Sequence, residues 1–317
     1  MKKLIILTGP TAVGKTKLSI ALAKAVNGEI ISADSMQVYR HMDIGSAKIH
    51  PEQMQGIKHY LVDIMEPSED FNIVLFQTYA KQAMAEIYGK GKIPILVGGT
   101  GFYIQSVLYD IDFSKSDENP ALRAELEAVA RQKGTAYLHS LLKECDEKAA
   151  EEIHANNVKR VIRAIEYFRQ TGRKISEHNE TQRRKQCAYD ARYFVLTDER
   201  QRLYENIDKR VDIMIKNGLV DEVRKLLAMG CMRDSTAMQG LGYKEIISYL
   251  EGETTLEEAV YIIKRDTRHF AKRQLTWFRR ERDVLWLEKN KFAYDEEKML
   301  NYMLGVINNE HGNREHL

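Results

Sequence analysis

A phosphate-binding loop is predicted near the N-terminus. The residues Gly9-Pro10-Thr11-Ala12-Val13-Gly14-Lys15-Thr16 follow the spacing G-x-x-x-x-G-K-[ST]. The two glycines let successive backbone N–H groups converge on anionic oxygens, Lys15 can reach a terminal phosphate, and the Thr16 hydroxyl can ligate Mg²⁺. A helix predicted directly after the loop adds its positive N-terminal end to the same site. The pattern therefore predicts a site for a phosphate or diphosphate group and leaves open which compound carries it.

A carboxylate is expected beside this loop. Asp34 directly follows a short strand predicted at 29–33. Because the carboxyl ends of parallel strands line the ligand crevice of an α/β sheet, Asp34 is placed there, where it can take a proton or hold Mg²⁺ through water. The alternative is that Asp34 and Ser35 cap the following turn.

The turn Gly98-Gly99-Thr100-Gly101 follows another predicted strand, at 93–97. Its glycines permit close approach of a second backbone or a ligand, and the Thr100 hydroxyl can point into the crevice. Alternatively, Thr100 is the N-cap of the next helix. The local sequence favours neither interpretation.

Two segments are strongly basic. Residues 159–185 and 264–282 each carry a net charge of +6, whereas the whole chain carries only +2. Lys159 and Arg163 are four residues apart in a predicted helix and therefore share one face. Such concentrations in an otherwise acidic chain favour an extended polyanion, nucleic acid first among them.

The positions of apolar residues predict the elements that must hold these groups. Strands are expected at 4–7, 29–33, 59–64, 93–97 and 193–196, and the principal helices at 71–88, 123–131, 137–143, 158–169, 203–215, 220–229, 244–250 and 256–277. Strands alternating with helices indicate an α/β fold, with a P-loop-type parallel sheet core flanked by helices. The alternation stops between 114 and 188. We therefore expect a core of residues 1–113 and 189–317 and a mainly helical inserted domain of residues 114–188.

Composition indicates a globular protein of the cytoplasm. The chain has 317 residues, of which 44% are hydrophobic and 30% charged, and it has no apolar run near the ~20 residues that span a bilayer. The short apolar stretch at the N-terminus runs into the phosphate loop, which argues against a signal peptide. Cys145, Cys187 and Cys231 are far apart and odd in number, which argues against a disulfide framework or a zinc finger.

A phosphate loop alone allows several functions. One is an ATP-dependent P-loop kinase of a small substrate, another is an RNA-binding protein that senses a nucleotide, and a third uses the loop to hold diphosphate as a leaving group. No apolar strand after Asp63 ends in an Asp of the Walker B type, which makes hydrolysis-driven switching the weaker choice.

The motifs together resemble the bacterial tRNA dimethylallyltransferase (tRNA isopentenyltransferase) family over essentially the whole chain. Besides the phosphate loop, the blocks that carry the likeness are Asp34-Ser35-Met36-Gln37-Val38-Tyr39-Arg40, Met42-Asp43-Ile44-Gly45-Ser46-Ala47-Lys48, Leu96-Val97-Gly98-Gly99-Thr100-Gly101, residues 157–166, Gly240-Leu241-Gly242-Tyr243 and Lys272-Arg273-Gln274-Leu275-Thr276-Trp277.

The resemblance implies transfer of the dimethylallyl group of dimethylallyl diphosphate to N6 of the adenosine 3′-adjacent to the tRNA anticodon. Lys15 and Thr16 would then neutralise the departing diphosphate together with Mg²⁺, Asp34 would be the general base, and Thr100 would lie near the reacting centre. The target base must be flipped out of its stack to reach the crevice. Arg265, Arg268 and Arg273 are candidates for clamping the diphosphate.

The same resemblance implies a tRNA interface on the anticodon stem-loop, a monomeric enzyme and no membrane. The residues that it assigns to tRNA contact are Asp34, Ser35, Met36, Gln37, Thr100, Arg123, Lys159, Arg160, Val161, Ile162 and Arg163.

Overall fold

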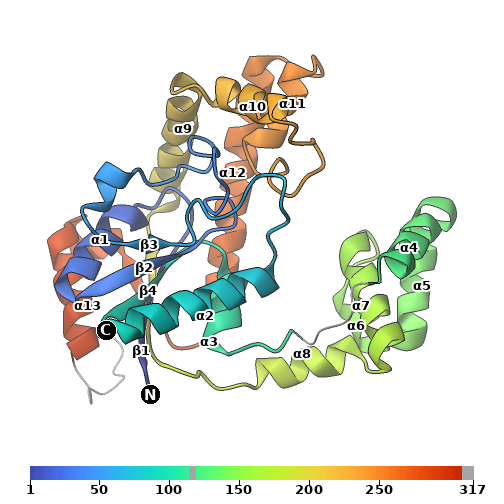
Figure 1. The fold of residues 1–317 in the computed structure, drawn as a ribbon, viewed down its shortest axis with the longest axis horizontal. Coiled ribbons are helices and arrows are strands. Elements are labelled where there is room, and N and C mark those ends of the chain that lie inside the picture. The colour runs from blue at the N-terminus through green and yellow to red at the C-terminus, as the bar shows by residue number, and fades with distance from the viewer. Residues whose placement is uncertain (114–118, 309–317) are drawn as a thin grey trace. The chain divides into compact units, whose positions relative to one another are not determined.

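A computed structural model describes residues 1–113 and 119–308 of the chain, which form two compact units (Figure 1). The first unit comprises Met1–Leu108 and Ala188–Leu317, and the second Tyr109–Cys187. The boundaries expected from the sequence, 113/114 and 188/189, remain a prediction, and residues 114–118 lie outside the described residues.

One all-parallel sheet organises the first unit. Among the described residues it has six strands in the order β3-β2-β4-β1-β5-β6. Their bounds are β1 Lys3–Thr8, β2 Gly28–Ala33, β3 His59–Tyr60, β4 Ile93–Gly98, β5 Asp190–Thr197 and β6 Val284–Glu288. Strands β4, β2 and β3 lie on one side of β1, and β5 and β6 lie on the other. The register pairs Thr8 of β1 with Gly98 of β4 and Val195 of β5. The predicted α/β class is thereby confirmed.

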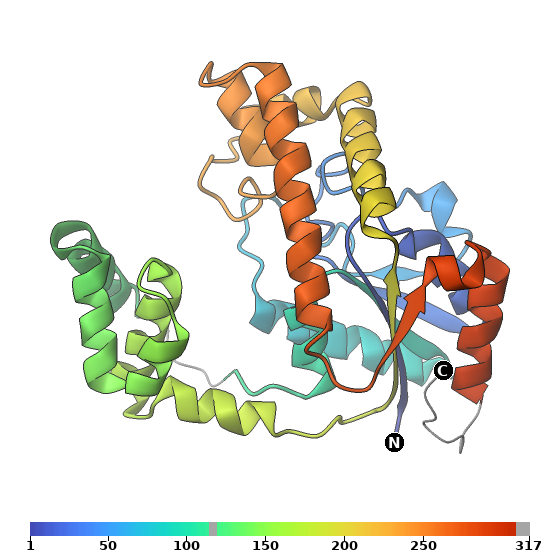
Figure 2. The same ribbon diagram turned by 180° about the vertical axis from the view of Figure 1, so that it is seen from behind.

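Helices cover both faces of this sheet. The helices of the first unit are α1 Lys15–Ala25, α2 Ile73–Gly89, α3 Gly101–Leu108, α9 Arg200–Lys216, α10 Leu219–Ala228, α11 Tyr243–Leu250, α12 Leu256–Phe278 and α13 Glu296–Asn308. Figures 1 and 2 show α1 and α13 on the side of the sheet opposite α2. Leu18 and Leu22 of α1 and Met299 of α13 share one buried cluster with Ile5 and Ile95 of the sheet.

Two parts of the sheet differ from the expectation. The strand expected at 59–64 ends after Tyr60, because Leu61 and Asp63 have φ values of +62° and +55°, which no strand accommodates. Strand β6 was not predicted; it lies at the sheet edge beside β5 and is only five residues long.

Helices make up most of the described part of the second unit. It contains α4 Pro120–Lys133, α5 Thr135–Cys145, α6 Glu147–Glu152, α7 Val158–Thr171 and α8 Ile175–Arg183. Its first helix begins at Pro120, where Asn119 is the N-cap: the Asn119 side chain accepts a hydrogen bond from Leu122 N at 3.0 Å. Its core gathers Leu126, Leu138, Leu142 and the apolar face of α7.

Within residues 1–113 and 119–308, no helix combines the length and the apolar character that crossing a membrane requires.

Candidate active site

The phosphate loop connects β1 to α1, and its glycines are required by geometry. Gly9 has φ +147°, and a Cβ atom there would lie 2.2 Å from the carbonyl oxygen of Leu196 in β5. Gly14 has φ +98° at the N-cap of α1. A residue other than glycine would strain the backbone at either position. The loop therefore packs closely against β5, and the N-terminus of α1 faces the place where a phosphate would bind.

Lys15 has one donor left for a ligand. Its ammonium donates to the carbonyl oxygens of Gly9 at 2.9 Å and Pro10 at 2.8 Å, and an ammonium has three N–H groups. Burial, together with repulsion by Arg210, lowers the pKa of Lys15 to about 7, against a smaller attraction by Asp34. An anion bound here would restore the charged form.

Asp34 both caps the turn after β2 and lines a cavity. It follows β2, and its Oδ1 accepts hydrogen bonds from Met36 N at 2.8 Å and Gln37 N at 3.3 Å, which makes it a turn cap. It also lines a cavity together with Gln37. Because both cap bonds use Oδ1, Oδ2 remains available to accept a proton.

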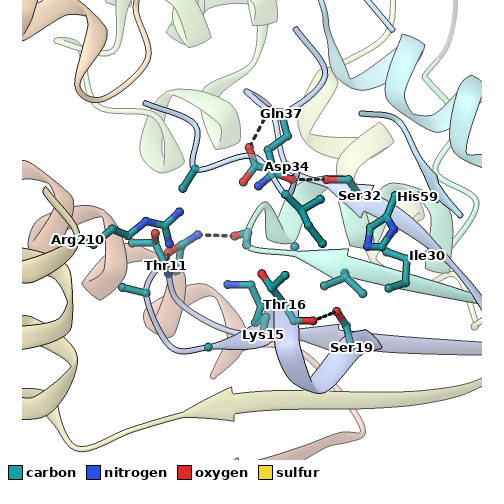
Figure 3. Close-up of a pocket in the computed structure, with 18 of the residues that line it drawn as sticks. Thr11, Lys15, Thr16, Ser19, Ile30, Ser32, Asp34, Gln37, His59 and Arg210 are labelled. Carbon is teal, nitrogen blue, oxygen red and sulfur yellow. Dashed lines mark hydrogen bonds between the residues drawn. The ribbon is translucent and has the colours of Figure 1, made fainter. Parts of the chain in front are cut away.

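The cavity has a volume of about 350 Å³, within the range of small-molecule sites. In Figure 3, Arg210 and Thr11 lie on one side of the space and Ile30 and His59 on the other, with Lys15 between them. The remaining lining residues include Ala12, Gly14, Thr16, Ser32, Asp34, Gln37, Ala47, Ile49, Val97, Gly98, Gly99, Asn206, Phe270 and Gln274. The site therefore joins a cationic region to an apolar one.

Arg210 is a site residue that sequence reasoning missed. It lies on α9 four residues after Asn206, so that both line the cavity from one helix face. The proposed clamps are engaged elsewhere: Arg265 pairs with Asp266 at 2.8 Å, and Arg268 pairs with Asp208 at 2.5 Å. Arg273 stacks over the Phe270 ring at 5.7 Å and does not line the cavity.

Burial lowers the pKa of Arg210, and attraction by Asp34 only partly opposes this shift. The cavity thus holds two cations, Arg210 and Lys15, whose charged forms are disfavoured by burial. Such an arrangement is typical of an anion site rather than of a structural ion pair.

Gln274 of α12 links the phosphate loop to the glycine turn. Its Oε1 accepts from Thr11 N at 2.9 Å, and its Nε2 donates to Gly99 O at 2.9 Å. A Cβ atom at Gly99 would lie 2.1 Å from Gln274 Nε2, and one at Gly101 2.2 Å from Trp277. The glycines of this turn therefore admit the close approach of α12.

The other residues of the predicted site divide between the cavity and its surroundings. Thr16 lines the cavity, and Ser35, Met36 and Thr100 do not. Thr100 precedes α3, and its carbonyl oxygen accepts from Tyr103 N at 3.0 Å. This places Thr100 at the helix start, next to Gly98 and Gly99 of the cavity wall.

Residues 159–163 of α7 carry charged side chains on one side of the helix and apolar side chains on the other. Lys159, Arg160 and Arg163 are exposed. Val161 and Ile162 are 0% and 3% exposed and belong to the core of the unit, so their side chains support α7, and any contact with RNA falls to the charged neighbours.

Arg123 forms a two-pronged ion pair. Its Nε and Nη2 donate to the two carboxylate oxygens of Glu166 at 3.0 and 2.8 Å, and Glu166 is buried. A bidentate pair of this kind fixes α4 to α7. Arg123 is half exposed, which leaves part of its guanidinium surface accessible.

The cavity suits Mg²⁺ only together with a phosphate ligand. Among residues 1–113 and 119–308, no group of three His, Cys, Asp or Glu side chains is arranged to hold a metal. The cavity offers the Thr16 hydroxyl and the Asp34 carboxylate. Mg²⁺ typically binds through one or two protein oxygens, substrate phosphates and water, and these residues fit that pattern.

Comparison with known proteins identifies the family. The family model described as IPP transferase matches residues 37–281, and that of isopentenyl transferase matches residues 2–69. The tRNA dimethylallyltransferase of Lachnoclostridium phytofermentans is 64% identical, covering 93% of this chain and 94% of the relative. That of Acetivibrio thermocellus is 52% identical over 97% of this chain and 99% of the relative.

Solved structures agree. The tRNA isopentenylpyrophosphate transferase of Bacillus halodurans has a TM-score of 0.72 at 44% identity, with 96% of each chain covered. A eukaryotic dimethylallyltransferase solved acting on tRNA has a TM-score of 0.85 at 29% identity, covering 98% of this chain and 79% of its own. The chain therefore belongs to the IPP transferase family, the prenyl-transferring enzymes that include the bacterial tRNA dimethylallyltransferases, as its motifs indicated.

Proposed function

We propose that the protein transfers the dimethylallyl group of dimethylallyl diphosphate to N6 of the adenosine 3′-adjacent to the anticodon in tRNA and releases diphosphate. One observation carries the proposal: a single cavity combines the phosphate loop and two partly buried cations with a carboxylate and apolar side chains. The relatives' names, tRNA dimethylallyltransferase, support the same reaction.

The reaction breaks the bond between the allylic carbon and a diphosphate oxygen and forms a bond from that carbon to N6. Lys15, Arg210 and the backbone N–H groups of the loop stabilise the charge that develops on the departing diphosphate. Asp34 takes the proton that N6 loses. The apolar part of the cavity, including Ile49 and Val97, accommodates the dimethylallyl group.

Gln37 is suited to hold the acceptor base. Its Oε1 accepts from Ser32 Oγ at 3.1 Å, which leaves the Nε2 hydrogens to donate to a base that has been flipped out of its stack. Ser35, Met36 and Thr100, close in sequence to cavity residues, are assigned to RNA contacts around the reacting centre.

We assign Mg²⁺ as the cofactor, held by the Thr16 hydroxyl and, through water, by Asp34. When bound, it neutralises charge on the diphosphate. We further propose that the enzyme works as a monomer in the cytoplasm, where its tRNA substrate is found.

Incubation with unmodified tRNA, Mg²⁺ and labelled dimethylallyl diphosphate tests the function. We expect label on the tRNA at the adenosine 3′ to the anticodon. Unlabelled tRNA together with consumption of ATP would instead support the alternative, an ATP-dependent kinase of a small substrate.

The exposed charges on α7 are expected to bind the anticodon stem-loop. Charge reversal at Lys159, Arg160 and Arg163 should weaken tRNA binding and flatten its salt dependence, because each lost phosphate contact removes about 0.7 to 0.9 from the slope of log K against log salt. Binding titrations at several salt concentrations measure both effects. The matched control reverses Arg131, Lys133 and Lys143, an equal change in charge; equal slopes in the two variants would place the RNA elsewhere.

Diphosphate affinity is expected to fall as pH rises above about 7, the pKa of Lys15 in the free protein. The bound anion favours the charged ammonium, so binding takes up a proton above that pH, and affinity falls by up to about tenfold per pH unit. Calorimetric titration with inorganic diphosphate and Mg²⁺ between about pH 6.5 and 8.5 measures the slope.

Lys15→Met separates this effect from titration of the diphosphate itself, and equal slopes in parent and variant would contradict the assignment.

The lowered pKa of Lys15 also predicts how the stability of the free protein depends on pH. Because the unfolded chain still binds the proton that folded Lys15 has lost, the free energy of unfolding of the free protein should rise with pH between about 7 and 10.5.

A further inference from the structure

Glu222 of α10 binds a backbone turn that is distant from it in sequence. Its Oε2 accepts hydrogen bonds from Asp43 N at 2.9 Å and Ile44 N at 2.7 Å, and its Oε1 accepts from Gly45 N at 3.0 Å. The same Oε1 accepts from the Tyr243 hydroxyl at 2.8 Å. One carboxylate thus receives four donors, three of them consecutive backbone N–H groups.

Close packing reinforces this contact. Tyr243 begins α11 and is fully buried. A Cβ atom at Gly45 would lie 2.5 Å from Tyr243 Cζ, so only glycine allows the ring to lie against this turn. A few residues away, a Cβ atom at Gly240 would lie 2.5 Å from Met36 Cε. Residues of the last third of the chain therefore pack on the 34–49 segment at two places.

The turn bound by Glu222 continues into the cavity wall. Ala47 and Ile49 line the cavity. Between them, the side chain of Lys48 is only 3% exposed and donates to Tyr39 O at 2.7 Å, Asp43 Oδ1 at 2.6 Å and Asp63 Oδ1 at 2.5 Å. The turn at 43–45 is thus joined through Lys48 to Tyr39.

Tyr39 in turn belongs to the turn that holds the proposed base. Tyr39 is fully buried, and its N–H donates to Met36 O at 3.2 Å. Met36 N and Gln37 N are the two groups that bind Asp34 Oδ1. A continuous set of hydrogen bonds therefore runs from Glu222 to the Asp34 turn.

We propose that Glu222 and Tyr243 are positioning residues of the transfer reaction: they hold the 43–49 wall of the cavity and, through Lys48 and Tyr39, the turn that carries Asp34 and Gln37. The inference rests on the proposed function. Without the carboxylate, three adjacent N–H groups lose their acceptor and the wall loosens, so Asp34 no longer meets the acceptor nitrogen at the required distance. The phosphate loop, which belongs to another part of the chain, keeps its geometry.

The test compares Glu222→Ala, Glu222→Gln and Tyr243→Phe with Asp221→Ala. Asp221 is the exposed neighbour of Glu222 on the same helix and pairs with Arg224. We expect kcat to fall about 10²-fold in Glu222→Ala, as misplacement of a reacting group by about 1 Å does, and less in Glu222→Gln, whose amide keeps one acceptor oxygen. Binding of inorganic diphosphate should stay within about twofold of the parent.

Amide hydrogen exchange supplies a readout that does not depend on activity. Exchange should accelerate in peptides covering residues 34–48 in both Glu222 variants and stay unchanged in Asp221→Ala. If Glu222→Ala fails to fold, Glu222→Gln and Tyr243→Phe carry the test.

If folded variants keep the kcat and the amide hydrogen exchange of the parent, the inference is wrong. It is also wrong if diphosphate binding and kcat fall by the same factor, because that result indicates general unfolding. Failure of the parent itself to label tRNA would instead count against the proposed function, and hydrogen exchange would still decide whether Glu222 holds the wall.

Discussion

Asp34→Asn is expected to lower kcat by about 10²- to 10⁴-fold, the range that general base catalysis contributes, while tRNA binding and folding are preserved. The amide oxygen of Asn can still accept from Met36 N and Gln37 N, as Asp34 Oδ1 does at 2.8 and 3.3 Å. It cannot take the proton from N6. Steady-state labelling at saturating tRNA and dimethylallyl diphosphate measures kcat, and a separate titration measures tRNA binding.

Asp34→Ala separates the two roles of this residue. It removes the turn cap as well as the base, so its melting temperature should fall below that of Asp34→Asn, whereas both variants should lose turnover alike. An Asn variant with parent turnover, beside an Ala variant that is inactive and unstable, would show that Asp34 acts only as a cap.

Local features of the site could be predicted because short-range chemistry determines them. The phosphate loop needs glycine at two positions with positive φ and a strand on its N-terminal side, and both requirements are visible within a dozen residues. Asp34 could be placed because it follows a strand of an α/β sheet, where strand ends meet.

Arg210 could not be found in this way, because a long-range contact determines its role. In the sequence it is one of many basic residues on an amphipathic helix, and only the packing of α9 beside the cavity distinguishes it. Arg268 and Arg273 belong to a more basic segment and yet point elsewhere. Charge density indicated a nucleic-acid partner without indicating which arginine meets the diphosphate.

Among the secondary-structure elements too, those determined by local sequence could be predicted, and those determined by long-range packing could not. The long helix α12, Leu256–Phe278, was predicted at 256–277, and the equally regular α9, Arg200–Lys216, was predicted at 203–215. Such helices are found because their apolar spacing repeats over many turns. Short elements such as β6 and α6, of five and six residues, are too short for their apolar positions to establish a period, and the neighbours they pack on decide their conformation.

Arg210→Met is expected to weaken donor binding and lower the rate of transfer by about 10²- to 10³-fold, as loss of one group that stabilises developing charge does, and to stabilise the free protein. Burial disfavours the charged form of Arg210 more than Asp34 favours it, and Arg210 repels Lys15. Replacing the guanidinium with an apolar side chain of similar length removes both penalties. The pKa of Lys15 should rise in the variant, because one of its two lowering causes is lost.

Arg210→Met is expected to lower activity but raise the melting temperature. A substitution that merely damages the fold lowers both. Thermal unfolding without ligand should show a melting temperature about 2 °C above that of the parent, and titration with inorganic diphosphate should show weaker binding. Arg268→Met is the matched control: it breaks the ion pair to Asp208 and should leave diphosphate affinity unchanged. A parent-like affinity in Arg210→Met would remove this arginine from the diphosphate site; a lower melting temperature would mean that its charge stabilises the empty cavity.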